Sequence, residues 1–101
     1  MTVTGLATTV ALTLAIIGTA HAAGVADAPP GATSCTGCHA TARTVDTSVP
    51  RLIGRNPADL VALMQGFKSG QRPGTVMDRL AKGFTDDELK AIAEWFGAQK
   101  D

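Results

Sequence analysis

The spacing of apolar residues predicts a central amphipathic helix between Asn56 and Gly70. Its apolar side chains recur at the i, i+3, i+4, i+7 spacing of one helix face: Leu60, Leu63, Met64 and Phe67. Asn56 is a suitable N-cap, Pro57 suits the first turn, and Gly70 suits the end of the helix. Side chains on the apolar face are expected to pack in the core of a folded domain.

A second amphipathic helix is predicted near the C-terminus. Thr85 and Glu88 have the spacing of a capping box, in which the N-cap hydroxyl and a carboxylate three residues later satisfy backbone N–H groups. Gly97 is expected to end this helix, and Trp95, beside its apolar face, is expected to be a packing residue. The apolar face itself consists of Leu89, Ile92, Ala93 and Phe96.

The rest of the chain contains no useful run of alternating apolar and polar residues. One β-branched cluster, residues 44–49, is short and polar. Residues 40–55 are expected to form a loop, and residues 69–76 are too rich in Gly and Pro to form a helix interior. The sequence therefore predicts an all-α fold.

The first quarter of the chain carries no charged side chain, and all nine basic and nine acidic residues follow it. An apolar run from Val10 to Ile17 precedes Ala20-His21-Ala22, which is the pattern of a secretory signal with its cleavage site. We predict that residues 1–22 are removed after export and that residues 23–101 form one domain in the periplasm. No Lys or Arg precedes the apolar run. A retained membrane anchor is the alternative, because the 26 uncharged residues before Asp27 are almost sufficient to span a bilayer.

The charge and the size of the domain limit both its partners and the stability that its own core can supply. The chain has 101 residues and a formal net charge of zero, without the basic stripe of a nucleic-acid-binding protein. Once residues 1–22 are removed, the domain is near the size at which its own core supplies only a few kcal/mol. A covalent cross-link, a metal or a cofactor is therefore expected to stabilise it.

The residues able to form such a cross-link or to hold such a group are the two cysteines and the following histidine, in Cys35-Thr-Gly-Cys38-His39. A disulfide would close too short a loop to stabilise the domain much, and a thioredoxin-like redox pair would need a βαβ unit. Zinc needs four ligands, and these three residues are the ones left after the signal is removed. Covalent attachment of haem c uses all three, with a disulfide as the main alternative.

The spacing of these residues suits haem attachment. If the segment turns as a helix, Cys35 and Cys38 lie on one face and reach the two vinyl-derived carbons of one porphyrin. His39 then places an imidazole under the iron. A coordinating imidazole usually donates its other N–H group to an oxygen, and a loop carbonyl near Pro50 would serve as the acceptor.

The second axial ligand distinguishes an electron carrier from a haem enzyme or sensor with an open iron site. Met64 lies on the apolar face of a predicted helix, where a methionine more often packs in a core. Met77 lies in the Gly- and Pro-rich segment, where its thioether is freer to approach the iron. We therefore predict Met77 as the sixth ligand.

These features together resemble the class I cytochromes c, over nearly the whole chain after the signal. The matching residues are the Cys-x-x-Cys-His motif, the loop Pro50-x-Leu52-x-Gly54, the central helix, Met77 and the C-terminal helix. The resemblance implies one covalent haem, with thioethers at Cys35 and Cys38 and with His39 and Met77 as axial ligands. It also implies that the Pro50 carbonyl accepts a hydrogen bond from His39 and that Leu52 packs on the porphyrin.

A more specific resemblance is carried by Gly66-Phe-Lys-Ser-Gly70 and by the segment from Thr75 to Thr85. Both are similar to the cytochrome subunit of flavocytochrome c sulfide dehydrogenase, here with one haem motif in place of two haem domains. The resemblance implies a non-enzymatic periplasmic subunit, in a heterodimer with an FAD-containing flavoprotein that oxidises sulfide. Electrons would pass from the flavoprotein to the haem and then to a downstream periplasmic acceptor, without nucleic acid or membrane partners.

One alternative function and one departure from the family pattern accompany this resemblance. A free-standing soluble cytochrome c, shuttling electrons between other complexes, would use the same haem residues. The segment before Cys35 is short and contains Pro29 and Pro30, so the crossing of N- and C-terminal helices usual in the family is not expected in full.

Overall fold

The computed structural model describes residues 27–100. The predicted signal peptide and its cleavage site lie outside the described residues. Within residues 27–100 the chain forms helices and loops without strands, so the all-α prediction is confirmed. None of the described helices has the length and apolar character needed to cross a bilayer. The helices are α1 (Ala32–Cys35), α2 (Pro57–Ser69), α3 (Met77–Ala81) and α4 (Asp86–Ala98).

Helix α2 begins and ends where the sequence predicts. The Asn56 side chain accepts a hydrogen bond of 2.8 Å from the Ala58 N–H group, and Pro57 occupies the first helical position. Gly70 ends the helix in the left-handed conformation, with φ of 80°. This conformation is unstrained only for glycine, which explains the sharp stop.

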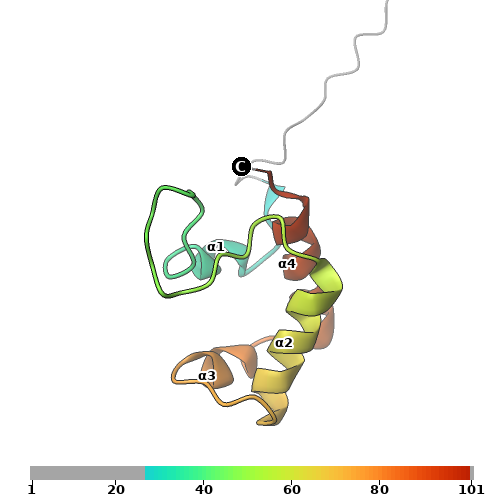
Figure 1. The fold of residues 1–101 in the computed structure, drawn as a ribbon. Helices are drawn as coiled ribbons and strands as arrows, with labels where there is room; N and C mark the ends of the chain where they lie inside the picture. Colours follow the sequence, from blue (N-terminus) through green and yellow to red (C-terminus); the bar gives the residue numbers. More distant parts are fainter. Residues whose placement is uncertain (1–26, 101) are drawn as a thin grey trace, which may run out of the picture.

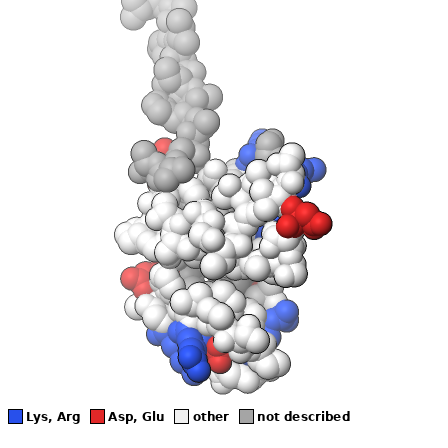
Figure 2. All heavy atoms as spheres, turned by 90° about the vertical axis from the view of Figure 1, so that its left-hand side faces the viewer, with Lys and Arg blue, Asp and Glu red and all other residues white. Residues whose placement is uncertain are grey.

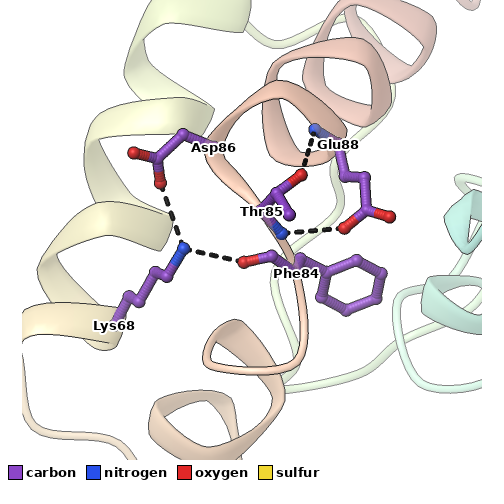
Figure 3. Close-up of polar contacts among 5 residues, drawn as sticks. All are labelled: Lys68, Phe84, Thr85, Asp86 and Glu88. Carbon is purple, nitrogen blue, oxygen red and sulfur yellow. Dashed lines mark hydrogen bonds and ion pairs between the residues drawn. The ribbon is translucent and has the colours of Figure 1, made fainter.

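Helix α4 begins with the predicted capping box (Figure 3). The Glu88 N–H group donates to Thr85 Oγ1 at 3.2 Å, and the Thr85 N–H group donates to Glu88 Oε2 at 2.7 Å. Two of the N–H groups that a helix start leaves without partners are thereby satisfied.

A lysine joins the end of α2 to the start of α4 (Figure 3). Lys68 Nζ donates to the Phe84 carbonyl at 2.7 Å and pairs with Asp86 Oδ1 at 3.1 Å. One side chain thus fixes the turn that leads from α3 into α4.

The predicted end of α4 at Gly97 is wrong, because the helix continues to Ala98. A Cβ atom on Gly97 would lie 2.7 Å from Pro57 Cγ and 2.9 Å from the Arg55 carbonyl oxygen. Glycine at this position therefore lets α4 approach the start of α2 closely. The Gly54 N–H group also donates to the Phe96 carbonyl at 3.0 Å, which joins the loop to the same end of α4.

The core lies where the apolar faces of α2 and α4 meet α1. Phe96 is only 1% exposed, and the Trp95 ring contacts it edge-on with ring centroids 4.8 Å apart. Trp95 is therefore a packing residue, as predicted. The buried cluster consists of Ala32, Leu60, Ile92, Ala93 and Phe96.

The short N-terminal segment reaches α4 without a full crossing helix. Ala32 is completely buried, and Gly31, with φ of 86°, is the N-cap of the four-residue α1. A Cβ on Gly31 would lie 2.5 Å from Phe84 Cε1 and 3.6 Å from Ile92 Cδ1. The backbone at Gly31 and Ala32 therefore packs closely against Phe84 and α4, in place of the crossing of N- and C-terminal helices that is usual in the family.

Figure 1 shows how these elements surround the candidate site. Helices α2 and α4 pack side by side, and α3 packs against α2. Helix α1 and the loop after it lie on the same side of this pair as α3, with α1 above and α3 below. Cys35 ends α1 and Met77 begins α3, so a predicted haem-attachment residue and a predicted iron ligand come from the upper and the lower part of this side.

Candidate haem site

The cysteine motif continues α1 by one helical turn. The His39 N–H group donates to the Cys35 carbonyl at 2.9 Å, and the Cys38 N–H group donates to the same oxygen at 3.3 Å. The expected helical arrangement of the motif is therefore present. Cys35 is half-buried and Cys38 is exposed, and no disulfide joins them.

The ring of His39 is oriented by the loop that follows the motif. Nδ1 forms a hydrogen bond with the Pro50 carbonyl oxygen, as the sequence predicts. Because the carbonyl can only accept, Nδ1 carries the proton and Nε2 keeps the lone pair that binds a metal. Arg51 Nη2 donates to the Thr41 carbonyl at 3.3 Å and joins the two ends of this loop.

The surroundings of Cys35 do not favour the redox alternative. Burial is the largest influence on this thiol and raises its pKa, although a hydrogen bond from Ser34 acts in the opposite direction. A thioredoxin-like pair needs a lowered pKa at its attacking cysteine. Zinc is also disfavoured, because residues 27–100 bring together no group of three or more His, Cys, Asp or Glu side chains able to hold a metal.

Met77 is the first residue of α3, so its predicted position in a loop is wrong. The Gly- and Pro-rich segment ends before it, and the Leu80 N–H group donates to the Val76 carbonyl at 3.1 Å to close the first helical turn. Met64 lies within α2, and both methionines are half-buried. Burial alone therefore does not separate the two candidates, whereas only Met77 lies at a helix start beside a Gly- and Pro-rich segment.

The described core leaves room for a large apolar group. Phe96 is the one large side chain among the described residues that is less than 2% exposed, and the buried set contains three alanines. Other apolar side chains that a core would normally cover are only half-buried: Leu52, Ile53, Leu63, Met64, Phe67 and Met77. Figure 2 shows a largely uncharged surface, hollowed in the middle, on the side where α1 and α3 lie. The residues present therefore fit a haem.

Leu52 contributes a side chain to this region, whereas Pro50 contributes a backbone oxygen. Leu52 is half-buried and packs against the buried cluster, while Pro50 contributes its backbone oxygen to His39. Sequence reasoning missed the surface of α3, where Val76 and Leu80 are 56% and 49% exposed. Their i, i+4 spacing was the available signal, but the Gly- and Pro-rich segment before them suggested a loop.

Comparison with known proteins identifies the family. The chain is 42% identical over 64 residues to the cytochrome subunit of sulfide dehydrogenase of Chlorobaculum tepidum, which covers 63% of the chain and 58% of that protein. It is 35% identical to cytochrome c4 of Azotobacter vinelandii, covering 91% of the chain and 49% of that protein. It is also 35% identical over 66 residues to the thiosulfate dehydrogenase electron acceptor of Stutzerimonas stutzeri, covering 61% of the chain and 31% of that protein.

The chain spans about half of the length of the curated relatives that it matches. No protein-family model matches it. The relatives share the name of cytochrome or of electron acceptor, and the described residues have the helical fold and the Cys-x-x-Cys-His turn expected of such proteins. These similarities identify the chain as a member of the class I c-type cytochromes.

Proposed function

We propose that one haem is attached through thioethers to Cys35 and Cys38, with His39 and Met77 as axial ligands of its iron. The observation that carries this proposal is the hydrogen bond between His39 Nδ1 and the Pro50 carbonyl, next to the two thiols. It fixes the tautomer that leaves Nε2 available to the iron. When bound, the haem supplies the one-electron redox couple, which His/Met ligation keeps at a high potential.

The chain's own residues have supporting tasks at this site. Leu52 would offer apolar surface to the porphyrin, and the Pro50 carbonyl orients the imidazole. A saturated iron surrounded by apolar side chains exchanges electrons without binding substrate. Residues 1–22 direct export, so the mature protein operates in the periplasm.

The cytochrome is further proposed to be the haem subunit of a flavocytochrome c sulfide dehydrogenase. The 42% identity to the Chlorobaculum tepidum protein supports this assignment. In it, an FAD-containing flavoprotein oxidises sulfide and passes electrons singly to the haem. The cytochrome then reduces a further periplasmic acceptor.

Purification of the native protein from the periplasm tests the assignment. We expect a mass corresponding to residues 23–101 plus one haem, copurification with a flavin-containing protein, and reduction of the haem by sulfide in the complex. A Cys35→Ser, Cys38→Ser double variant should lose haem on extraction with acidified acetone, whereas the parent protein retains it. A lone cytochrome without flavin that sulfide does not reduce would contradict the subunit assignment.

A second candidate function is electron acceptor for a thiosulfate dehydrogenase. It is supported by the 35% identity to the Stutzerimonas stutzeri protein of that name. Adding thiosulfate in place of sulfide to the same periplasmic fraction separates the two candidates, because only the matching substrate should reduce the haem.

A further inference from the structure

The ring of Phe67, in the last turn of α2, is contacted by the segment that leads to Met77. Gly70 ends α2, and the Arg72 N–H group then donates to the Gly66 carbonyl at 2.9 Å, which folds the segment back along the helix. The Arg72 guanidinium lies over the Phe67 ring, 5.3 Å from its centre. A cation thus covers one face of the ring.

Gly74 brings the backbone of the same segment against the edge of the ring. A Cβ atom on Gly74 would lie 3.0 Å from Phe67 Cε1, 3.2 Å from Phe67 Cδ1 and 3.3 Å from the Asp78 backbone nitrogen. The Gly74 backbone therefore lies between the ring and the first turn of α3, where Asp78 directly follows Met77. Because Gly74 and Met77 are three residues apart, the position of the ring limits where the Met77 backbone can lie.

The next residue of α2 holds the other end of this stretch of chain (Figure 3). Lys68 Nζ donates to the Phe84 carbonyl, which lies after α3, at 2.7 Å. Helix α3 itself packs on α2. Two neighbouring side chains of α2 therefore contact the chain on either side of α3, Phe67 before it and Lys68 after it.

We propose that Phe67 is a positioning residue for the sixth ligand: its ring, in contact with Arg72 and Gly74, fixes the backbone from which the Met77 thioether reaches the iron. This role rests on Met77 being an axial ligand, which is itself part of the proposed function. Residues 70–76 contain two glycines, so without the ring the segment would have many alternative conformations. A segment that is already fixed loses little further freedom when the thioether binds, and external ligands then compete poorly for the iron.

The alternative is that Phe67 contributes only to stability, as one side chain of the apolar face of α2. Its replacement would then lower the free energy of unfolding without changing the competition for the iron. Binding of an external ligand to the folded protein separates the two roles.

Imidazole binding to the oxidised, haem-loaded protein measures how firmly Met77 is held. Imidazole replaces the thioether on iron(III): one Fe–S bond breaks, one Fe–N bond forms, and no electron is transferred. The dissociation constant is obtained by absorbance titration, in which the far-red charge-transfer band of methionine bound to iron(III) disappears.

The first test variant is Arg72→Ala, which uncovers the ring and keeps the backbone bond to Gly66. Arg72 is exposed, so the substitution leaves no cavity in the core. We expect imidazole to bind about two- to fivefold more tightly, because a contact with the strength of an exposed cation–π pair is lost. The matched control is Arg79→Ala, which removes the same charge from an exposed position in α3 and should change the dissociation constant less than twofold.

The second test variant is Phe67→Leu, which removes the ring and with it the contacts to Arg72 and Gly74. Imidazole should bind at least about tenfold more tightly, as expected when a well-packed large side chain is shortened. The matched control is Leu60→Val, in the buried cluster of the same helix. This control should lower the midpoint of urea unfolding but change imidazole binding less than twofold.

Variants of Met77 separate the positioning role from the ligand assignment. Met77→Ala should bind imidazole far more tightly than the parent protein, and adding Arg72→Ala to it should have no further effect, because Arg72 acts through Met77. If Met77→Ala binds imidazole no more tightly than the parent, the ligand assignment and the positioning role fail together. If it does bind tightly, the positioning role alone is overturned by either of two results: both test variants equal to their controls, or an Arg72→Ala effect that is the same with and without Met77.

Discussion

Replacement of Gly97 by alanine tests the close contact between α4 and the start of α2. Helix propensity alone predicts stabilisation, because alanine is favoured over glycine by up to about 1 kcal/mol in a helix interior. Packing predicts the opposite, since the added Cβ would lie 2.7 Å from Pro57 Cγ and 2.9 Å from the Arg55 carbonyl oxygen. The sign of the change in stability therefore shows which effect dominates.

The magnitude depends on which atoms can move. Pro57 is the first residue of α2 and the Arg55 oxygen belongs to the backbone, so neither can rotate away as a flexible side chain would. Overpacking of this kind costs about 1–3 kcal/mol, and the propensity gain near a helix end offsets less than about 1 kcal/mol. We expect a net loss of about 1–2 kcal/mol in the free energy of unfolding.

The assay is urea unfolding of the haem-loaded protein, followed by far-ultraviolet circular dichroism. With a slope of about 1 kcal/mol/M for so small a chain, the midpoint should fall by about 1–2 M. The matched control is Gly66→Ala in α2, whose Cβ would meet only Arg72 Cβ, at 3.3 Å, a contact that a shift of a few tenths of an ångström relieves. The control should be neutral or slightly stabilising. If Gly97→Ala is as stable as the control, the close contact between α4 and α2 is refuted.

Four further substitutions test the site and the helix junction. Met77→Ala should allow the reduced protein to bind carbon monoxide, whereas Met64→Ala should leave it resistant; absorbance spectra check both, and the reverse result would make Met64 the ligand. Lys68→Met removes the bond to the Phe84 carbonyl and an exposed ion pair, and should lower the free energy of unfolding by about 1–2 kcal/mol in the same urea assay. Thr85→Ala should cost about 1 kcal/mol by removing the N-cap acceptor, and a midpoint equal to that of the parent would show that the cap contributes nothing.

The sequence predicts the long helices well because their ends are determined locally. Asn56, Gly70 and Thr85 act on backbone groups within three residues of themselves, so a short window contains all the information needed. The end of α4 is not predictable in this way, because Gly97 serves a contact with Pro57, far away in sequence. The bond from Lys68 to Phe84 is likewise not predictable, since it joins residues sixteen positions apart.

In the candidate site, too, the features that depend on neighbouring residues are predictable and those that depend on distant residues are not. The turn of Cys35, Cys38 and His39 is contained in five residues, and its helical arrangement is predictable from their spacing. The bond to Pro50 is predictable because a metal-binding imidazole requires an acceptor and the neighbouring loop supplies one. The helical position of Met77 is not predictable from the sequence. The Gly- and Pro-rich residues before it dominate the local pattern, whereas α3 is stabilised by packing on α2, which is distant in sequence.

The acceptor for His39 is a main-chain oxygen, and this has a consequence for evolution and for solution behaviour. No substitution of the Pro50 side chain deletes that oxygen, so single mutations can shift the orientation of the His39 ring but cannot remove its hydrogen-bond acceptor. An amide oxygen also stays uncharged over the whole working range of pH, unlike the carboxylates that perform this task in other metalloproteins. The imidazole is thus held by a partner that neither acidification nor ordinary mutational drift can switch off.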